Sequence, residues 1–516
     1  MPKKSKAATL LLSVVLILSM LVSACSGSGS NAGTSGPAAN KGSAENSSAG
    51  GSANDVNEKE MELTVAFLGL GNMQEVGLVQ EEISKITKEK INATVKLMPI
   101  DVGAWTQQVN LLLAGNEPLD LLVTSSFFNF SSQVAKGQLL PIDELVEKWG
   151  PGIKDTMEPA IFSSTKIGGK SYGVPSVRDT AADQGFIARK DLMDKYNLIF
   201  DNVKTFADLE PIFQTIKENE PGIYPLVQRS QAISVTVDLV RGYIDTLGDT
   251  PGVLIVDNQD LKVVNLYEQQ IYKDALQLAR KWYQAGYIMP DAATTQESNI
   301  SLVKAGKGFG YLSNMKPGFE AQETNVTGQE LVAVRLNKPI STSDAGTGFM
   351  MSIPKNTQDP DRAAQLLNLL YTDKDIVNLL ANGVEGKHYT DAGNGLIKAP
   401  EGGSNYVFNQ WQVGNNALAK VWEGTSPDIW EQTKEFNKSA IFSKALGFSF
   451  DSSPVKTEVA AVTNVNNQYK AGLESGTIDP SKLDEFVSKL KQAGLDKIIA
   501  EKQKQLDAWA KENNVQ

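Results

Sequence analysis

The sequence is poor in residues with catalytic or metal-binding chemistry: it has one cysteine, Cys25, and one histidine, His388, in 516 residues. A single cysteine excludes an intramolecular disulfide and any site built from several thiols. A single histidine excludes a two-histidine metal site, and a Ser-His-Asp triad would depend on His388. A glycosidase needs only two carboxylates, but no pair among the 60 acidic residues stands in a local motif. We therefore expect no enzymatic activity, no metal and no cofactor.

Positive charge is also scarce, with 49 lysines and arginines and a net charge of −11. Proteins that bind nucleic acid need basic surface to neutralise phosphates, so we expect no nucleic-acid partner. The same acidic balance argues against electrostatic docking on anionic lipid. The hydrophobic and charged fractions, 41% and 21%, are ordinary for a globular protein. Because a single core stops growing near roughly 250–300 residues, the length predicts two lobes or domains.

The one long apolar run lies at the N-terminus, immediately before the one cysteine. Lys3, Lys4 and Lys6 precede residues 7–22, which are almost wholly apolar, and two small residues follow. This is the pattern of a secretory signal peptide, and its apolar core is shorter than the ~20 residues of a membrane-spanning helix. We expect residues 1–24 to be removed, which takes away three lysines and no acid and moves the net charge from −11 to −14.

Residues 22–25, Val-Ser-Ala-Cys, resemble the lipobox of bacterial lipoproteins. The resemblance implies that Cys25 becomes the new N-terminus and carries a diacylglycerol on its sulfur; the alternative is an ordinary signal peptide with an incidental cysteine. Residues 26–54 are rich in Gly, Ser, Ala and Asn and too poor in large apolar residues to fold. We expect residues 25–58 to form an acylated cysteine and a flexible tether with a reach of about 30 Å.

The first part of the folded body alternates short apolar runs with helical periodicity. Val76, Val79, Ile83 and Ile86 have the spacing of one helix face. We predict strands at 63–68, 93–98 and 119–123 and helices at 75–90 and 105–114, which is the start of a doubly wound α/β lobe. Later segments predict strands at 185–189, 252–256, 261–264, 309–312, 331–335 and 348–353, and helices at 205–218, 232–246, 267–285, 299–305, 361–371, 483–493 and 495–510.

Two loops follow strand C-termini, where open α/β sheets bind ligands. In residues 69–72, Gly69 and Gly71 suggest a dinucleotide fingerprint, but Gln74 occupies the third glycine position, which argues against that interpretation. The second loop, residues 124–130, contains Phe127 and two further phenylalanines. We expect two of the three rings to fold back into the lobe, and one exposed ring would offer a surface on which a sugar could stack.

Three segments carry a resemblance to a known family. They are Gly-Val-Glu-Gly-Lys-His-Tyr at 383–389, residues 446–456 and residues 496–507, and a weaker Gly-Lys-Gly-Phe run begins at Gly306. With them the sequence resembles the extracellular solute-binding proteins of family 1, in the LipO-type branch, which are lipoproteins that deliver ligand to ABC importers. Residues 446–456 are similar to the start of that branch's C-terminal domain of unknown function, and residues 496–507 to its last helix.

The resemblance implies a two-lobed α/β fold of the periplasmic-binding-protein-like type II class, with hinge crossings and a helical C-terminal extension. The crossings would fall near 175–184 and 342–348, which are extended or glycine-rich, as a hinge requires. Lobe 1 would comprise residues 59–178 and 348–390. Lobe 2 would comprise residues 184–341 and 391–516, with the LipO-type domain beginning at about 446.

The resemblance also implies the function: a monomeric, membrane-anchored substrate-binding lipoprotein that captures an extracellular solute, an oligosaccharide by preference, between its lobes. It would deliver this ligand to ABC transporter permease subunits from the outer face of the cell membrane, in a Gram-positive organism. Two alternatives stay open, a surface sensing or binding lipoprotein that serves no importer, and a peptide-binding protein.

Sugar recognition needs aromatic faces and polar groups that pair with hydroxyls. Residues of both types lie in loops after strands or at the crossings. The stacking candidates are Trp105, Phe127, Tyr311 and Trp411, and the hydroxyl partners are Asn129, Arg178, Asp179, Asn314 and Glu385. The alternatives are a hinge salt bridge for Arg178 and Asp179, a core position for Trp411, and a purely structural turn for Glu385, Lys387 and His388.

Overall fold

The computed structural model describes residues 59–515, except 103, 116, 231–232 and 249–250. The predicted signal peptide, the lipidation site Cys25 and the tether lie outside the described residues. None of the helices in the described part of the chain combines the length and the apolar character that crossing a membrane requires.

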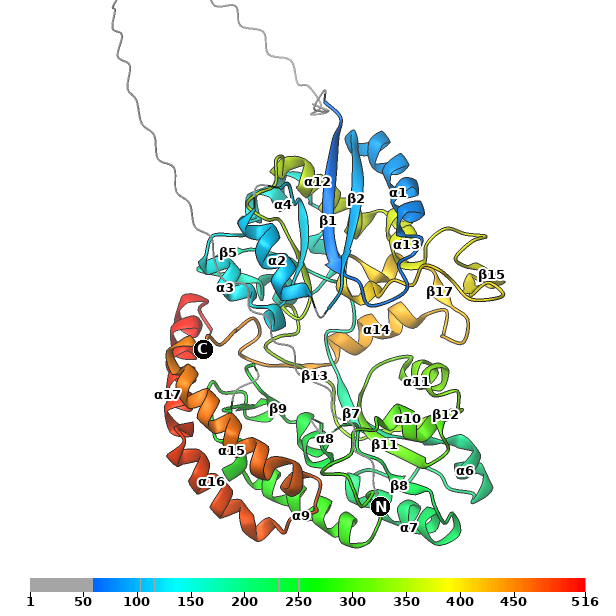
Figure 1. Cartoon of the computed structure of the whole chain (residues 1–516), viewed down its shortest axis with the longest axis vertical. Coiled ribbons are helices and arrows are strands. Elements are labelled where there is room, and N and C mark those ends of the chain that lie inside the picture. Colours follow the sequence, from blue (N-terminus) through cyan, green and yellow to red (C-terminus); the bar gives the residue numbers. More distant parts are fainter. Residues whose placement is uncertain (1–58, 103, 116, 231–232, 249–250, 516) are drawn as a thin grey trace, which may run out of the picture. The chain divides into compact units, whose positions relative to one another are not determined.

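Lobe 1 is built on a five-stranded sheet in the order β2-β1-β3-β14-β6. Figure 1 shows β1 and β2 of this sheet side by side. Strands β1, β2 and β3 are parallel, whereas β14 runs antiparallel to its neighbours β3 and β6. Residues 63–68 of β1 are all buried, as expected for a parallel strand covered on both faces. The strands are β1 (Met61–Leu68), β2 (Ala93–Ile100), β3 (Leu121–Thr124), β6 (Val174–Pro175) and β14 (Met350–Ser352).

Helices cover this sheet through apolar stripes of helical spacing. In α1, Val79 and Ile83 are buried four residues apart, and Ile91 closes the stripe. The helices of lobe 1 are α1 (Val76–Ile91), α2 (Trp105–Ala114), α3 (Phe130–Ala135), α4 (Asp143–Trp149), α5 (Pro159–Ser163), α12 (Pro360–Thr372) and α13 (Lys374–Asn382), and a small hairpin is formed by β4 (Lys166–Ile167) and β5 (Lys170–Ser171).

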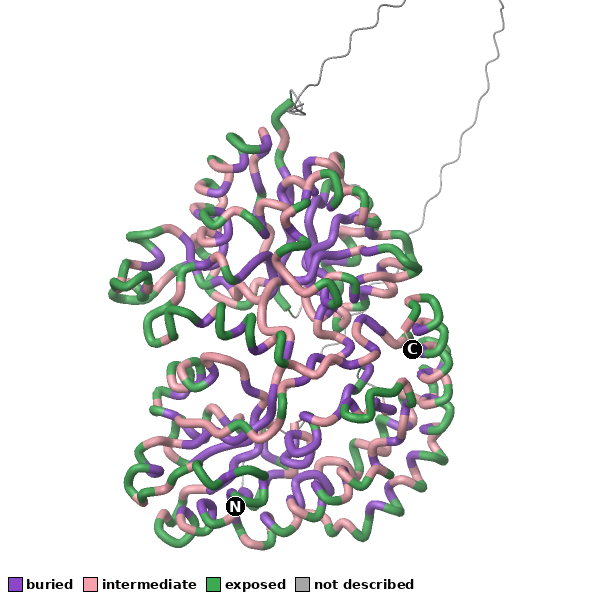
Figure 2. Tube along the Cα trace, turned by 180° about the vertical axis from the view of Figure 1, so that it is seen from behind, coloured by how far each residue is buried: buried purple, intermediate pink, exposed green. Residues whose placement is uncertain are grey.

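Lobe 2 contains a four-stranded sheet in the order β12-β7-β11-β8. Its core is aromatic: Phe213 lies between Phe186, at 5.2 Å, and Trp282, at 5.3 Å between ring centroids. Figure 2 shows that the buried residues concentrate in the interior of each of the two lobes. The strands are β7 (Asp183–Arg189), β8 (Tyr224–Leu226), β11 (Gly308–Met315) and β12 (Leu331–Arg335); the helices are α6 (Lys190–Lys195), α7 (Glu210–Asn219), α8 (Val235–Arg241), α9 (Gln270–Gln284), α10 (Asn299–Lys304) and α11 (Phe319–Thr327).

The C-terminal helices α15 (Lys456–Glu474), α16 (Leu483–Gln492) and α17 (Leu495–Glu512) pack against lobe 2, where Figure 1 shows them in orange and red. Buried polar contacts anchor them. Glu474 accepts hydrogen bonds from Ser234 and Tyr272, at 2.8 and 3.0 Å. Lys502 donates to the carbonyl oxygens of Thr246 and Gly252, at 3.0 and 2.9 Å. The expected helical extension is therefore an integral layer of this lobe.

Residues 391–422 belong to lobe 1 and not, as expected, to lobe 2. The sequence analysis assigned residues 391 onward to lobe 2, but Tyr406, Phe408 and Val413 are buried in the core of lobe 1. The reason is a contact 344 residues apart: the Gln412 amide accepts from the backbone N–H of Leu68 and donates to its carbonyl, at 2.8 and 3.0 Å. The short strands β15 (Thr390–Gly393), β16 (Leu396–Lys398) and β17 (Val421–Trp422) belong to the same region.

Within residues 59–515, as far as the structure describes them, the chain passes between the lobes at three places. Two are the expected crossings, between β6 and β7 and between β13 (Ile340–Ser341) and β14. The third follows α14 (Ile429–Lys438), where β18 (Ile441–Phe442) pairs in parallel with β13. Asp245 holds the second crossing by accepting from the N–H and the hydroxyl of Ser343, both at 2.8 Å.

Two predicted elements of lobe 2 differ from the structure. The helix expected at 232–246 is shorter in the structure, where α8 ends at Arg241. It is followed by β9 (Ile244–Asp245), which pairs with β10 (Leu254–Ile255). The strand expected at 261–264 makes a single bridge, Val264 to Val253. In both places tertiary pairing of short apolar runs decides the conformation, which local periodicity does not encode.

Candidate ligand-binding cleft

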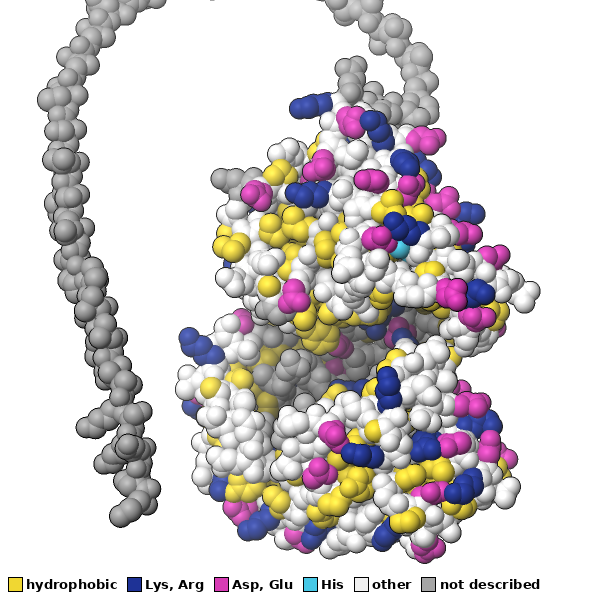
Figure 3. Space-filling model, turned by 45° about the vertical axis from the view of Figure 1, so that its right-hand side comes forward, with side chains coloured by type: hydrophobic (Ala, Val, Ile, Leu, Met, Phe, Trp, Pro, Cys, Tyr) yellow, Lys and Arg dark blue, Asp and Glu magenta, His cyan; other side chains and the backbone are white. Residues whose placement is uncertain are grey.

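A hollow of about 530 Å³ lies between the lobes. Figure 3 shows the molecule deeply grooved there. Lobe 1 contributes Phe349 and Trp411, the first crossing contributes Arg178 and Asp179, and lobe 2 contributes the rest of the lining. The lobe 2 residues are Arg229, Asn299, Ile300, Tyr311, Ser313, Asn314, Lys316, Phe319, Gln322, Glu323 and Val326.

The lobe 1 side of the hollow is an aromatic wall. Phe349, directly before β14, packs edge-on against Trp411, with 4.5 Å between ring centroids. Phe127 and Phe128 lie 6.3 and 6.4 Å from Phe349 and extend the wall along the lobe. Phe349 and Trp411 are half-buried and Phe127 is 54% exposed, so this wall offers ring surface to a ligand.

The lobe 2 side is polar and centres on Arg229. Its guanidinium donates to the side-chain oxygen of Asn314 at 2.9 Å and contacts the carboxylate of Asp238 at 3.3 Å. Asp238 is buried beneath the cleft on α8, and burial raises its pKa to about 7 although Arg229 and Arg241 oppose the shift. The buried acid therefore fixes the orientation of a cation that faces the ligand space.

A second charged group joins the first crossing to lobe 2. The carboxylate of Asp179 forms ion pairs with Arg178, at 3.2 Å, and with Lys316, which lies just beyond β11, at 3.3 Å. Burial acts to raise the pKa of Asp179, but the two cations outweigh it and hold that pKa below its usual value. Arg178 also lies 5.9 Å from the ring of Trp411, so the cluster contacts the aromatic wall as well.

The far end of the polar side is formed by Tyr311 and Glu323. Tyr311, in the middle of β11, donates its hydroxyl to a carboxylate oxygen of Glu323 on α11, at 2.5 Å. Burial, together with the hydrogen bond to Glu323, raises the pKa of Tyr311 well above its ordinary value. The phenol therefore stays protonated and keeps donating to the carboxylate across the physiological pH range.

Five of the predicted site residues line the hollow: Arg178, Asp179, Tyr311, Asn314 and Trp411. Phe127 borders it through Phe349 and is the exposed ring of its loop, while Phe130 is buried. The hinge salt bridge considered for Arg178 and Asp179 is also formed, at 3.2 Å.

The other predicted positions are corrected by the structure. Trp105 is 1% exposed in the core of lobe 1, so its ring offers no face for stacking; Tyr311 is equally buried and reaches the hollow only as a polar partner of Glu323. Asn129 is an exposed left-handed residue at the end of the 3-10 turn 126–128, outside the hollow. Glu385 lies outside the hollow too, paired with Lys420 at 2.8 Å.

The Gly-Val-Glu-Gly-Lys-His-Tyr segment forms a supported turn. His388 is buried; its Nδ1 accepts from the N–H of Val384 at 2.9 Å, so its Nε2 carries the proton that faces Glu75 at 3.0 Å. Gly383 has φ +81°, and a Cβ there would lie 2.3 Å from His388 Nδ1. These contacts match the structural alternative for Lys387 and His388, because Lys387 also pairs with Glu75, at 2.9 Å.

Sequence reasoning missed Arg229, Lys316, Glu323 and Phe349. Phe349 had a usable signal, because it adjoins the predicted second crossing and precedes a predicted strand. Glu323 had none, since an acid on a short helix is an ordinary surface residue by sequence.

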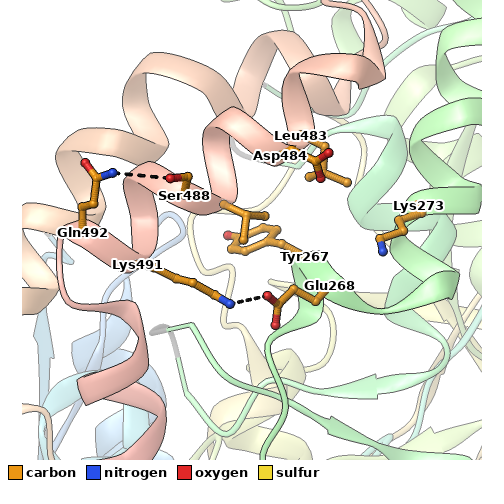
Figure 4. A pocket seen from close by; sticks show the side chains of 9 residues that line it. Tyr267, Glu268, Lys273, Leu483, Asp484, Ser488, Lys491 and Gln492 are labelled. Carbon is orange, nitrogen blue, oxygen red and sulfur yellow. Dashed lines mark hydrogen bonds and ion pairs between the residues drawn. The ribbon is translucent and has the colours of Figure 1, made fainter.

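A second hollow, of about 540 Å³, lies on lobe 2 beside the C-terminal helices (Figure 4). Lys491 of α16 reaches across it to Glu268, at 2.5 Å. Its one aromatic residue, Tyr267, is 7% exposed and packed edge-on against Phe486. It lacks the facing aromatic and polar sides of the cleft, so the cleft is the stronger candidate for ligand binding. Among the described residues, no group of three or more His, Cys, Asp or Glu side chains is placed to hold a metal ion.

Residues 71–376 match the family described as bacterial extracellular solute-binding protein, and residues 444–511 match a domain of unknown function, DUF3502. The chain belongs to the bacterial extracellular solute-binding proteins. The first match covers more than half of the chain, and the second begins within two residues of the expected start of the C-terminal domain. The family resemblance read from the sequence is thereby confirmed.

A carbohydrate ABC transporter substrate-binding protein of Streptococcus pneumoniae serotype 4 is 27% identical over 446 residues, 83% of this chain and 87% of the relative. The crystal structure of the N-glycan transport solute binding protein NgtS, also from S. pneumoniae, is 25% identical, with a TM-score of 0.75 over 88% of this chain and 98% of that one. The alginate-binding protein AlgQ2 shares the fold, with 16% identity and a TM-score of 0.56 over 88% and 99% of the chains. These likenesses confirm the two-lobed type II fold.

Proposed function

We propose that this protein captures an extracellular oligosaccharide in the cleft and delivers it to the permease of an ABC importer. The observation that carries the proposal is the pairing of an aromatic wall on lobe 1 with fixed hydrogen-bonding groups on lobe 2. A sugar ring has an apolar C–H face and a rim of hydroxyls, and it fits between two such surfaces. Relatives support the ligand class: NgtS has been crystallised with Man1GlcNAc and with Man5GlcNAc.

Closure of the lobes on the sugar would form the complex that the permease recognises. A ligand that contacts both sides of the cleft has more partners in the closed form, and this differential affinity shifts the population towards closure.

The N-terminal sequence supports the proposed location at the cell surface. A lipidated Cys25 followed by the tether would hold the folded body at the outer face of a Gram-positive cell membrane. Metabolic labelling with an alkynyl fatty acid tests this: the wild-type chain takes up label and Cys25→Ser does not. Label on the Cys25→Ser chain would overturn the assignment.

The ligand class is tested by thermal shift on the mature chain from residue 25 with Cys25→Ser, which removes the lipid and leaves the body intact. The panel contains Man1GlcNAc, Man5GlcNAc, malto-oligosaccharides, glucuronate-containing oligosaccharides and tripeptides. A ligand at a hundredfold excess over Kd stabilises the folded state by about 2.7 kcal/mol, which is readily detected. A shift with neutral oligosaccharides supports the proposal, and a shift with peptides alone overturns the sugar assignment.

Two further measurements separate transport from its alternatives. A sugar recovered unchanged after prolonged incubation agrees with a binding protein, whereas shortened products would reveal a hydrolase. Loss of uptake of the sugar in a deletion strain agrees with import. Normal uptake in that strain, with binding intact, would indicate a sensing or surface-binding lipoprotein instead.

A further inference from the structure

Glu323 differs from the other charged groups at the cleft in its partners. Its two carboxylate oxygens accept from neutral donors, the Tyr311 hydroxyl at 2.5 Å and the Gln322 amide at 2.9 Å. Within the described part of the chain, no lysine, arginine or histidine nitrogen lies within 4 Å of this carboxylate. Glu323 is 7% exposed and lines the hollow, so it is a shielded negative charge at the ligand space.

The remaining charged groups of the cleft are all paired with a group of opposite sign within the protein. Arg229 is paired with the buried Asp238, and Asp179 is shared by Arg178 and Lys316. With Asp238 ionised the pair is neutral, and the triad carries one excess positive charge, which lies at the crossing. Glu323 supplies the opposite charge, at α11. The formal charges of the cleft therefore sum to zero, which suits a ligand without net charge. An anionic sugar residue beside α11 would face the carboxylate of Glu323, which has no cationic partner among the described residues.

Tyr311 determines how this carboxylate is presented. It lies in the middle of β11, opposite Ile187 of β7, and its side chain is fully buried; β11 also pairs with β8 on its other edge, through Gly308 and Gly310. A carboxylate has about four lone-pair positions, and the two described side-chain donors use two of them. The others are available to a hydroxyl or an amide N–H of a ligand, at an orientation set by the rigid strand.

We propose that Glu323 is a specificity-determining residue, and that Tyr311 is its positioning residue. Glu323 accepts hydrogen bonds from hydroxyl or acetamido N–H groups of a neutral sugar, and it excludes sugars that carry a carboxylate at that position. The inference rests on the proposed carbohydrate function. Hydrogen bonds to an ionised acceptor are about twice as strong as neutral ones, and like charges brought together in a shielded site repel strongly.

The test compares two probes, Man1GlcNAc and a glucuronyl-N-acetylglucosamine disaccharide, by calorimetric titration of the mature chain with Cys25→Ser. With Glu323 intact we expect the neutral disaccharide to bind at least a hundredfold more tightly. Glu323→Gln keeps the shape and removes the charge. It should weaken binding of the neutral probe about tenfold and reduce the discrimination by tenfold or more. If the thermal-shift panel selects a different neutral sugar, that sugar and its uronate analogue replace the two probes.

The matched control is Glu320→Gln on the same helix. Glu320 is exposed, accepts from the N–H of Ala333 at 2.7 Å, and lies outside the hollow, so both affinities should stay at the wild-type values. Tyr311→Phe leaves the charge of the cleft unchanged. It should lower the ratio of the affinity for the neutral disaccharide to the affinity for the uronate. If Tyr311 had a merely structural role, both affinities would change by the same factor.

An unchanged ratio in Glu323→Gln, or a wild-type preference for the uronate, overturns the role of Glu323 and leaves carbohydrate binding standing. Failure of every sugar in the panel to bind the wild-type chain overturns the proposed function and this inference with it.

Discussion

The two sides of the cleft differ in chemistry. Lobe 1 offers Phe127, Phe349 and Trp411, whereas lobe 2 offers Arg229, Asn314 and Glu323 in fixed hydrogen-bonded positions. Stacking needs only an apolar sugar face and tolerates many sugars, but a fixed donor or acceptor tolerates few. We therefore expect lobe 1 to supply most of the affinity and lobe 2 most of the selectivity.

The lobe 2 side of the cleft makes the stability of the protein depend on pH, through Asp238. Its pKa is about 7 in the folded protein, because of burial, and near 3.9 when unfolded. Between about pH 4 and 7 the folded state binds more protons than the unfolded state, so stability falls as pH rises and levels off above pH 7. The fall amounts to as much as roughly 4 kcal/mol. Asp238→Asn should remove this contribution, which urea denaturation at several pH values measures.

The control for Asp238 is Asp260→Asn, an exposed acid of the same lobe that should keep the wild-type slope. Asp183, whose pKa is raised to about 6 by burial, contributes a similar slope and remains in both variants. An Asp238→Asn protein with the full wild-type slope would show that Asp238 is already ionised at low pH.

The segment that follows the third crossing contacts lobe 1 at Gly447. Gly447 has φ +91°, and a Cβ there would lie 2.6 Å from the Cα of Ser164 in lobe 1. We expect Gly447→Ala to lower the unfolding free energy by about 3 kcal/mol, from left-handed strain and overpacking together. Gly402→Ala is the matched control, with φ +94° and no atom within 4 Å of the added Cβ, and should cost about 1 kcal/mol. Equal losses in the two variants would mean that the lobe contact is unimportant.

The aromatic side is tested by Trp411→Ala. We expect about a thirtyfold loss of affinity, roughly 2 kcal/mol, and a similar loss for every sugar that binds, because stacking is shared. Trp422→Ala is the control: Trp422 is 38% exposed, donates to Asn382 and lies outside the hollow. A loss confined to one sugar would assign selectivity to lobe 1 and contradict the division between the sides.

The smallest effect is expected at the outer end of the wall. Phe127→Ala should weaken binding of Man5GlcNAc about threefold and leave Man1GlcNAc unchanged, since a longer chain alone would reach this exposed ring. Titration with both sugars measures the difference. An equal loss for both would place the shorter ligand against Phe127 as well.

Part of the site could be anticipated because it lies at strand ends and crossings. Arg178, Asp179, Asn314 and Trp411 were predicted from such places and line the hollow. Trp105 was wrongly predicted, because an aromatic at the start of an amphipathic helix has the same local pattern whether it faces a core or a cleft. The placement of residues 391–422 was wrong for a related reason: the amide of Gln412 pairs with Leu68, and no local pattern records a partner so distant.

The sequence alone predicted the family and most of the elements. Alternating periodicity, glycine turns and the 383–389 motif act over a few residues, and such short-range signals are legible in a single chain. Only the tertiary structure decided which polar residues meet. Tyr311 and Asn314 lie on β11, Asp238 on α8 and Glu323 on α11, and Arg229 lies between β8 and α8. Burial of apolar surface, which is not directional, brings these elements together. The position of a charge at the cleft is thus a consequence of packing.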